Sequence, residues 1–426
     1  MVDLKAVRED PDTFRMALRR RGRDSSLVDR ALELDRAWRE ALQEVERLRA
    51  EQNRASAEVA RLSGPEREQK IAEVRALAAR LKEREPEARR RRQELEQVLL
   101  LFPNVPHPSV PDGTGEQDNV VVRTWRTPPR FDFPPLDHVE LGRRLAILDF
   151  ERAGKVSGSR FYFLLGKGAL LEMALVRYAV DRLLRWGFVP VIPPVLVRPE
   201  IITGAWGGAA FDPQQTYRVA EDHLALVGTS EQSLAGFYRD EVLEADRLPV
   251  RFAGVSWCFR REAGAHGRET RGLYRVHQFD KVEMFSYAHP DRSWEEHEFL
   301  LRVEEEILQG LGIPYRVVLL CAGDLGTASA KTYDLEAWMP GRGAYGEVTS
   351  CSNTTDFQAR RLNVRFRERG RTEFVHTLNG TALATSRILI AILENYQQSD
   401  GSVRVPDALV PYTGFDRIGP ADRGAL

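Results

Sequence analysis

The sequence predicts an α+β protein in which an antiparallel two-helix coiled-coil arm precedes a body made of an antiparallel sheet flanked by helices. Apolar residues recur at spacings of three and four through most of residues 27–100, as in helices that pair through one face. A proline-rich stretch ends this pattern, and strand-like and helix-like segments then alternate irregularly, without repeated βαβ units. Irregular alternation of this kind favours an antiparallel sheet over a parallel one.

Length and composition exclude several classes of protein. The chain has 426 residues, and 62 basic side chains nearly balance 63 acidic ones, which excludes a strongly basic nucleic-acid coat protein. A hydrophobic content of 42% is enough for a sizeable core. No run approaches 18 apolar residues, and the charged start lacks the apolar segment of a secretory signal. We therefore expect a cytoplasmic protein with no membrane span.

Cysteine and histidine usage argues against a structural metal. The three cysteines, Cys258, Cys321 and Cys351, form no CxxC pair, and none of the eight histidines shows HExxH spacing. The sequence therefore predicts neither a disulfide framework nor a zinc site.

The arm is assigned to residues 1–103. One apolar stripe runs over residues 38–62 and a second over residues 71–99, and Ser63-Gly64-Pro65 between them is typical of a helix stop and restart. Helices of this length extend for about 50 Å and should pair as a projecting hairpin. Pro86 inside the second stripe predicts a kink or a shift of register.

A basic cluster in the second arm helix has two interpretations. Arg89 to Arg92 are consecutive, and Arg84 lies nearby. The cluster is either a solvated helix face or a patch that contacts nucleic-acid phosphates.

Residues 104–132 are predicted to be a linker and entry segment. Four prolines fall between Pro103 and Pro111, next to Gly113-Thr114-Gly115, and such a stretch cannot continue a helix. The body then spans residues 133–426. Within it we expect an amphipathic helix over 168–186, two strands over 250–260 and 273–287 around a glycine-rich loop, and a buried helix over 381–396.

A nucleotide site, if present, uses neither common glycine loop, because GxxxxGK[ST] and GxGxxG are both absent. The two predicted strands offer polar residues instead. Alternation would place Arg260 and Glu262 on one face, and Arg275, Phe279 and Glu283 on another. Charges on an inner face point to a polar ligand, whereas the alternative is the solvated face of an edge hairpin.

Glu347-Val348-Thr349-Ser350 is a second polar segment. Regular alternation puts Glu347 and Thr349 on one face and the other two residues on the opposite face, unless a bulge redirects them. A carboxylate near a hydroxyl is compatible with Mg²⁺, and an ordinary strand end is the alternative.

A third segment enters the last helix. Asn379-Gly380-Thr381 resembles a capped strand-to-helix turn, and Arg387 follows within the apolar helix. A buried arginine needs an anion, which would be either a phosphate or the carboxylate of an internal salt bridge.

Together these segments resemble the class II aminoacyl-tRNA synthetases. The helix ending at Gly187 and the strand to Pro194 resemble motif 1, the Arg260-x-Glu262 segment with its loop and strand resembles motif 2, and residues 379–387 resemble motif 3. The finer similarity is to the seryl-tRNA synthetase family of the bacterial type. It rests on the opening Met1–Lys5, Thr229–Glu231, Phe259–Phe285, Cys321–Asp334, Glu347–Asn353, Glu394–Gln397 and Gly401–Pro406.

The resemblance implies an ATP-dependent ligase that charges tRNA(Ser) with L-serine through a seryl-adenylate, and that also serylates tRNA(Sec) where this tRNA exists. It implies a homodimer with motif 1 at the interface, and an arm that grips the long variable arm of the tRNA. Arg260, Arg387 and Glu347 would be the catalytic residues, and Glu347 and Ser350 would bind Mg²⁺. The serine site would comprise Thr229, Ser230, Glu231, Arg260, Glu283, Asn379 and Thr381. The ATP site would comprise Arg260, Arg261, Glu262, Arg275, Val276, Phe279, Glu347, Val348, Thr349, Ser350 and Arg387.

Two other functions are compatible with a related fold. A paralogue that loads another carrier would lack the arm, and residues 27–100 argue against it. A non-catalytic coiled-coil scaffold would be expected to lose pocket charges, but Arg260, Glu262, Glu283, Glu347 and Arg387 are all present.

Overall fold

The computed structural model describes residues 1–207, 214–263 and 272–420, so most of the predicted glycine-rich loop lies outside the described residues. The chain divides into two compact units, Met1–Pro103 and Asn104–Leu426. None of the described helices is both long enough and apolar enough to cross a membrane.

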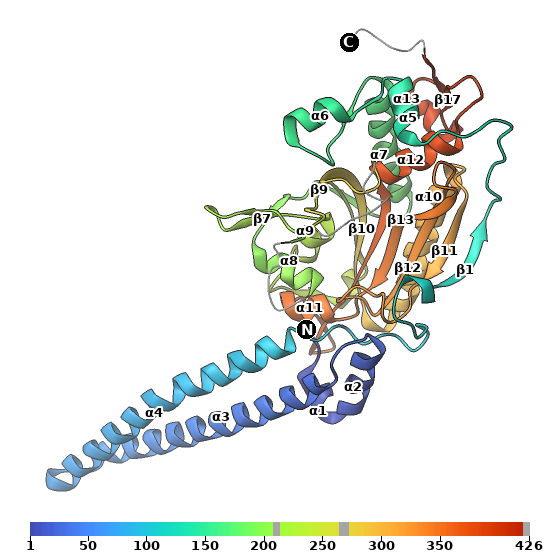
Figure 1. Cartoon of the computed structure of the whole chain (residues 1–426). Coiled ribbons are helices and arrows are strands. Elements are labelled where there is room, and N and C mark those ends of the chain that lie inside the picture. The colour runs from blue at the N-terminus through green and yellow to red at the C-terminus, as the bar shows by residue number, and fades with distance from the viewer. Residues whose placement is uncertain (208–213, 264–271, 421–426) are drawn as a thin grey trace. The chain divides into compact units, whose positions relative to one another are not determined.

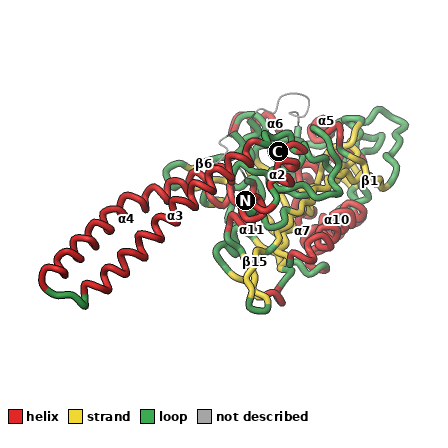
Figure 2. Tube along the Cα trace, turned by 90° about the horizontal axis from the view of Figure 1, so that it is seen from below, coloured by secondary structure: helices red, strands yellow, loops and turns green. Residues whose placement is uncertain are grey.

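The first unit is entirely helical. Two short helices, α1 (Leu4–Glu9) and α2 (Pro11–Arg20), precede the long helices α3 (Ser26–Val59) and α4 (Gly64–Leu99). The long helices lie side by side and are joined by a short turn, as both views show (Figures 1 and 2). The predicted two-helix arm is therefore confirmed.

The arm helices pair through small and aliphatic side chains. Val45, Leu48 and Ala55 of α3 are buried against Leu77, Leu81 and Ala88 of α4. Burial of a leucine side chain contributes about 1.5–3 kcal/mol, so this seam holds the hairpin together. Helix α4 runs through Pro86 without a break, so the proline does not end the helix as an interior proline often does.

An eight-stranded sheet organises the second unit. β4 is an edge strand that pairs in parallel with β9, and the other pairings in this sheet are antiparallel. The predicted linker contributes the other edge strand, β1. The order is β1 (Val120–Trp125), β11 (Tyr315–Leu319), β12 (Lys331–Met339), β13 (Ala344–Asn353), β16 (His376–Ala384), β10 (Gln278–Ala288), β9 (Val250–Phe259) and β4 (Val189–Val191).

Three helices pack on the sheet and share its core (Figure 1). They are α7 (Lys167–Arg185), α10 (Ser293–Gly310) and α12 (Thr385–Asn395). The α+β fold class is therefore confirmed. The remaining helices are α5 (His138–Arg144), α6 (Phe150–Ser157), α8 (Pro199–Trp206), α9 (Ser230–Ala235), α11 (Phe357–Leu362) and α13 (Val410–Thr413). The remaining strands are β2 (Leu148–Asp149), β3 (Phe163–Leu164), β5 (Leu196–Val197), β6 (Arg218–Val219), β7 (Leu224–Leu226), β8 (Val242–Glu244), β14 (Arg365–Glu368), β15 (Arg371–Phe374), β17 (Val403–Arg404) and β18 (Arg417–Ile418).

Two local predictions were wrong. The segment Asn379-Gly380-Thr381 lies inside the central strand β16, and the last helix begins at Thr385 rather than at residue 381. Close packing, and not a turn, explains the glycine at position 380. A Cβ on Gly380 would lie 2.8 Å from Oε1 of Glu304. The strand predicted to begin at residue 273 begins at Gln278.

Candidate active site

Most of the predicted site residues meet in one cleft of the second unit, which is partly open to solvent. The cleft is lined by Trp206, Thr229, Glu231, Arg260, Glu262, Tyr274, Arg275, Val276, Phe279, Lys281, Glu347, Val348, Thr349, Ser350, Asn379, Thr381, Ala384, Ser386 and Arg387.

Arg260 reaches the cleft from just beyond the end of β9. Its Nε donates a hydrogen bond to the carbonyl of Gly228 at 3.1 Å, and its guanidinium lies 5.4 Å from the centre of the Phe279 ring. Glu262 follows with a left-handed φ of 49° and accepts a hydrogen bond from Arg275 at 3.3 Å. Arg260, Glu262 and Arg275 therefore converge through the chain path after β9 and before β10, and strand alternation did not apply to them. Phe279 lies on β10 itself.

A carboxylate and its polar partners form the deep end of the cleft. Glu283 is fully buried and accepts hydrogen bonds from Nδ2 of Asn379 at 3.1 Å and from Oγ1 of Thr381 at 3.4 Å. Glu283 itself is not part of the lining. It lies directly behind Asn379 and Thr381 and sets how their polar groups are presented.

Glu231 is an acid that lines the cleft near Glu283. Its Oε1 accepts a hydrogen bond from Nε2 of Gln358 at 2.8 Å. Burial, reinforced by the nearby carboxylate of Glu283, raises the pKa of Glu231 to about 7. The group is therefore poised to ionise when a cation binds next to it.

Lys281 is a site residue that the sequence reasoning missed. Its ammonium forms an ion pair with Glu283, and both side chains are almost completely buried. Lys281 lies on the same strand face as Phe279 and Glu283, so the period of two along β10 was a signal that could have identified it.

Arg387 and Glu347 face each other at the other end of the cleft. Nη1 of Arg387 lies 3.1 Å from Oε1 of Glu347, and the guanidinium lies 4.7 Å from the centre of the Tyr274 ring. Burial opposes ionisation of Glu347, but Arg387 outweighs it and lowers the pKa of the carboxyl. The internal salt bridge expected as an alternative therefore exists, and it lies inside the cleft.

A bulge in β13 brings four consecutive residues to the cleft. Glu336 pairs with Glu347 and the adjacent Leu335 pairs with Thr349, so Val348 is an extra residue in β13. A regular strand would send Glu347 and Ser350 to opposite faces, but here both line the cleft. Oγ1 of Thr349 donates to the buried Glu304 at 3.0 Å, and burial raises the pKa of Glu304 well above its usual value.

Besides Glu283, two predicted site residues lie outside the lining. Ser230 is buried and donates a hydrogen bond to the carbonyl of Gly254 at 3.4 Å, and Arg261 lies next to the cleft without lining it. Besides Lys281, the lining residues that the sequence reasoning missed are Trp206, Tyr274, Ala384 and Ser386.

The residues present fit a magnesium ion that is shared with a substrate. Among the described residues, no group of three or more histidines, cysteines or acids could hold a metal alone. Mg²⁺ usually takes only one or two carboxylates and completes its shell with water and substrate phosphates. The carboxylate of Glu347 and the hydroxyl of Ser350 supply that kind of partial ligand set.

Comparison with known proteins covers both units. Residues 1–106 match the seryl-tRNA synthetase N-terminal domain, and residues 216–396 match the class II tRNA synthetase core domain (G, H, P, S and T). The serine–tRNA ligase of Thermobifida fusca is 52% identical over 421 residues, which cover 99% of each chain.

Comparison with solved structures gives the same family as comparison of the sequences. The chain superposes on the seryl-tRNA synthetase of Pyrococcus horikoshii complexed with ATP with a TM-score of 0.93 and 44% identity, covering 99% of this chain and 100% of the other. The cytoplasmic enzyme of Naegleria fowleri in complex with AMP gives a TM-score of 0.88 and 36% identity, covering 98% and 99%. The chain therefore belongs to the seryl-tRNA synthetase family, within the class II aminoacyl-tRNA synthetases.

Proposed function

We propose that this protein activates L-serine with ATP and transfers it from a seryl-adenylate to tRNA(Ser). The observation that carries the proposal is that one cleft is lined by Glu231, Thr229, Asn379 and Thr381 and also by Arg260, Arg275 and Arg387. The first group would suit a small amino acid and the arginines would suit phosphates. The similarity to serine–tRNA ligases over nearly the full length supports the same reaction.

In the first step a serine carboxylate oxygen attacks the α-phosphorus of ATP, and pyrophosphate leaves. Both reactants are anionic, so catalysis requires positive charge and alignment rather than a protein nucleophile. Arg260 would hold the serine carboxylate against the α-phosphate. Arg275 and Arg387 would bind the remaining phosphates, and Phe279 would stack on adenine.

Magnesium would be held by Glu347 and Ser350 together with the ATP phosphates. When bound, it supplies additional positive charge to the departing pyrophosphate. Glu347 would then have both the ion and Arg387 as neighbours, which fixes the orientation of its carboxylate.

Serine would be selected at the deep end of the cleft. Glu231 and Thr229 would bind the ammonium group, and Thr381, held from behind by Glu283, would bind the side-chain hydroxyl. Alanine would leave the buried Thr381 hydroxyl without that partner, and sites of this kind discriminate by up to ~10⁴–10⁵.

The arm would bind the tRNA. On α4, Arg75, Lys82 and Arg89 recur every seven residues and are exposed, and their side chains form no ion pair or hydrogen bond with a described residue. Seven residues correspond to about 10.5 Å along a helix, so the three cations form a straight row. Such a row suits the phosphate backbone of an RNA helix. By contrast, Arg90, Arg91 and Arg92 of the predicted basic cluster pair with glutamates.

A homodimer is proposed from an uncovered apolar face. Leu170, Met173 and Leu184 form an exposed ridge on α7, and Val189 and Ile192 are exposed on and beyond the edge strand β4. An exposed apolar edge strand invites association, and a second copy of this chain would cover it. We also propose a cytoplasmic location, where ATP and tRNA are available, and serylation of tRNA(Sec) where this tRNA exists.

The decisive experiment is pyrophosphate exchange into ATP, run with each of the twenty amino acids separately and without tRNA. Exchange with serine alone is the expected result. Exchange with a different amino acid would indicate a paralogue with another carrier, and no exchange with any amino acid would favour the scaffold.

A deletion of residues 30–100 separates the two steps. Because the cleft lies wholly within the second unit, serine-dependent exchange should survive while tRNA charging falls sharply. Charging at the rate of the full chain would refute the role of the arm.

A further inference from the structure

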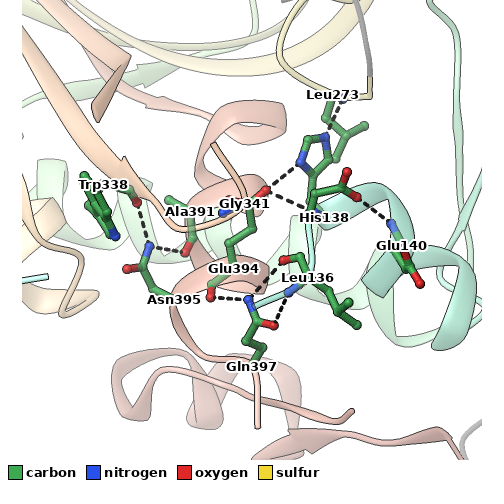
Figure 3. Close-up of polar contacts among 11 residues, drawn as sticks. Leu136, His138, Glu140, Leu273, Trp338, Gly341, Ala391, Glu394, Asn395 and Gln397 are labelled. Atoms are coloured by element: carbon green, nitrogen blue, oxygen red, sulfur yellow. Dashed lines mark hydrogen bonds and ion pairs between the residues drawn. The ribbon is translucent and has the colours of Figure 1, made fainter. Parts of the chain in front are cut away.

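His138 lies outside the cleft, yet both of its ring nitrogens are engaged (Figure 3). It is the first residue of α5 and is almost completely buried. Nδ1 lies 2.8 Å from Oε1 of Glu394, and Nε2 accepts a hydrogen bond from the backbone N–H of Leu273 at 3.1 Å. A nitrogen that accepts from a backbone amide carries no proton, so the remaining ring proton lies on Nδ1 and points to Glu394.

Glu394 connects this histidine to two further segments. Its Oε1 also accepts the backbone N–H of His138 at 3.0 Å, and its Oε2 accepts the N–H of Gly341 at 2.8 Å (Figure 3). The carboxylate is fully buried at the end of α12. It therefore ties together the start of α5, the turn between β12 and β13, and the helix that carries Arg387.

Two segments tied to this cluster, the one after Leu273 and helix α12, lead into the cleft. Leu273 is followed directly by Tyr274, Arg275 and Val276, which all line it. The carbonyl of Tyr274 accepts a hydrogen bond from Nε of Arg387 at 3.4 Å. The contact between His138 and Leu273 thus fixes the point at which the chain returns to the cleft.

The packing leaves no freedom around the imidazole. A Cβ on Gly272, whose φ is +76°, would lie 2.1 Å from Nε2 of His138. A Cβ on Gly341 would lie 2.9 Å from Oε1 of Glu394. Both glycines are therefore required where they approach the cluster.

We infer that His138 is a positioning residue for ATP: through its hydrogen bond to Leu273 it holds residues 272–276 so that Arg275 and Tyr274 are placed at the ATP end of the cleft. The inference rests on the proposed function, because it takes that end of the cleft to be the ATP site. The serine pocket is built from other segments, β10, β16 and residues 229–231, so the effect should be confined to ATP.

The test compares His138→Phe, which keeps a ring but removes both nitrogens, with the wild type and with Asn395→Ala. Asn395 belongs to the same cluster but bonds only to the carbonyls of Trp338 and Ala391 (Figure 3). In His138→Phe the KM for ATP in the exchange assay, and the Kd for ATP from calorimetry, should rise about tenfold or more. The KM for serine should change by less than about twofold, and Asn395→Ala should leave both constants near wild type. His138→Gln, which retains a donor and an acceptor, should recover part of the ATP affinity.

Gly272→Ala is a second route to the same contact, and it applies even if His138→Phe folds poorly. Its Cβ would displace the imidazole, so the same ATP-selective loss is expected. Unchanged ATP constants in both variants would overturn the inference. An equal rise of the ATP and serine constants would overturn it too, since that result indicates general loosening. Failure of the proposed function would look different, because wild-type exchange would then not require serine.

Discussion

Several charged residues at the cleft are paired with a residue of opposite charge. Arg387 has Glu347 as its carboxylate neighbour, and Lys281 has Glu283. Glu231 has hydrogen-bond partners in Gln358 and Trp206, and among the described residues it forms no ion pair. The positive charge of Arg387 would therefore stabilise a bound phosphate, and the negative charge of Glu231 would stabilise a bound ammonium group.

Arg387→Ala is expected to reduce serine-dependent pyrophosphate exchange by at least about 10²–10³-fold, because it removes a preorganised cation from the proposed phosphate site. Circular dichroism and sedimentation should show an intact fold. Arg404→Ala is a matched control, since Arg404 forms a half-exposed ion pair with Asp407 away from the cleft. Substantial exchange in Arg387→Ala would refute the phosphate assignment.

Serine affinity should depend on pH through Glu231. The pKa of this buried carboxyl is raised to about 7, so below that pH it carries a proton and attracts the serine ammonium less. The KM for serine should therefore rise as the pH falls below about 7, by up to about tenfold per unit. Exchange assays between about pH 5.5 and 8.5 measure this. Glu231→Gln should bind serine weakly at every pH, and a flat wild-type profile would exclude the assignment.

The resemblance to the synthetase family identified most of the lining residues. Residues that reach the cleft only through tertiary contacts could not be predicted from the sequence. Tyr274 and Trp206 carry no chemical signature, and they reach the cleft only because distant segments converge. Glu283 was expected in the site and lies just behind it, because Asn379 and Thr381 cover its carboxylate.

At the level of elements, periodicity succeeded where the element was long. The arm stripes and the helix over 168–186 were predicted correctly, since several turns repeat the signal. Asn379-Gly380-Thr381 was mistaken for a turn, because local propensity favours turns for these residues while tertiary pairing with β10 makes them a strand.

The row on α4 makes a prediction at this level. The triple variant Arg75→Gln, Lys82→Gln, Arg89→Gln should raise the KM for tRNA about tenfold or more and flatten its salt dependence, because three phosphate contacts are lost. Serine-dependent exchange without tRNA should be unchanged. The control is Arg47→Gln, Arg54→Gln, Arg61→Gln, a triple of equal charge on α3 and the turn that follows it. An equal rise of the KM for tRNA in both variants would show that only the net charge of the arm affects tRNA binding.

At the level of the whole molecule, the two units each have a core, and the second unit leaves an apolar face exposed. Ile192 is 89% exposed and Met173 is 67% exposed. Burial of these apolar side chains in an interface with a second copy would be favourable. Composition alone could not predict this, because an exposed apolar residue is recognised only once the helix and strand faces are known.

Met173→Glu combined with Ile192→Glu is expected to convert the proposed dimer into a monomer, since each charge would be buried against the partner copy. Analytical ultracentrifugation at micromolar concentration measures the change. Met16→Glu, at an exposed apolar position in the first unit, is the control and should leave the mass unchanged. A wild type that sediments as a monomer would refute the dimer.

The bulges beside the cleft restrict how this gene can change. Val348 is an extra residue in β13 and Ala382 is an extra residue in β16, and each shifts the side chains that follow it to the other face. Many substitutions along these strands could be tolerated, but the loss or gain of one codon would exchange inward and outward side chains at once. Related genes should therefore differ by substitutions in these strands but not by insertions or deletions.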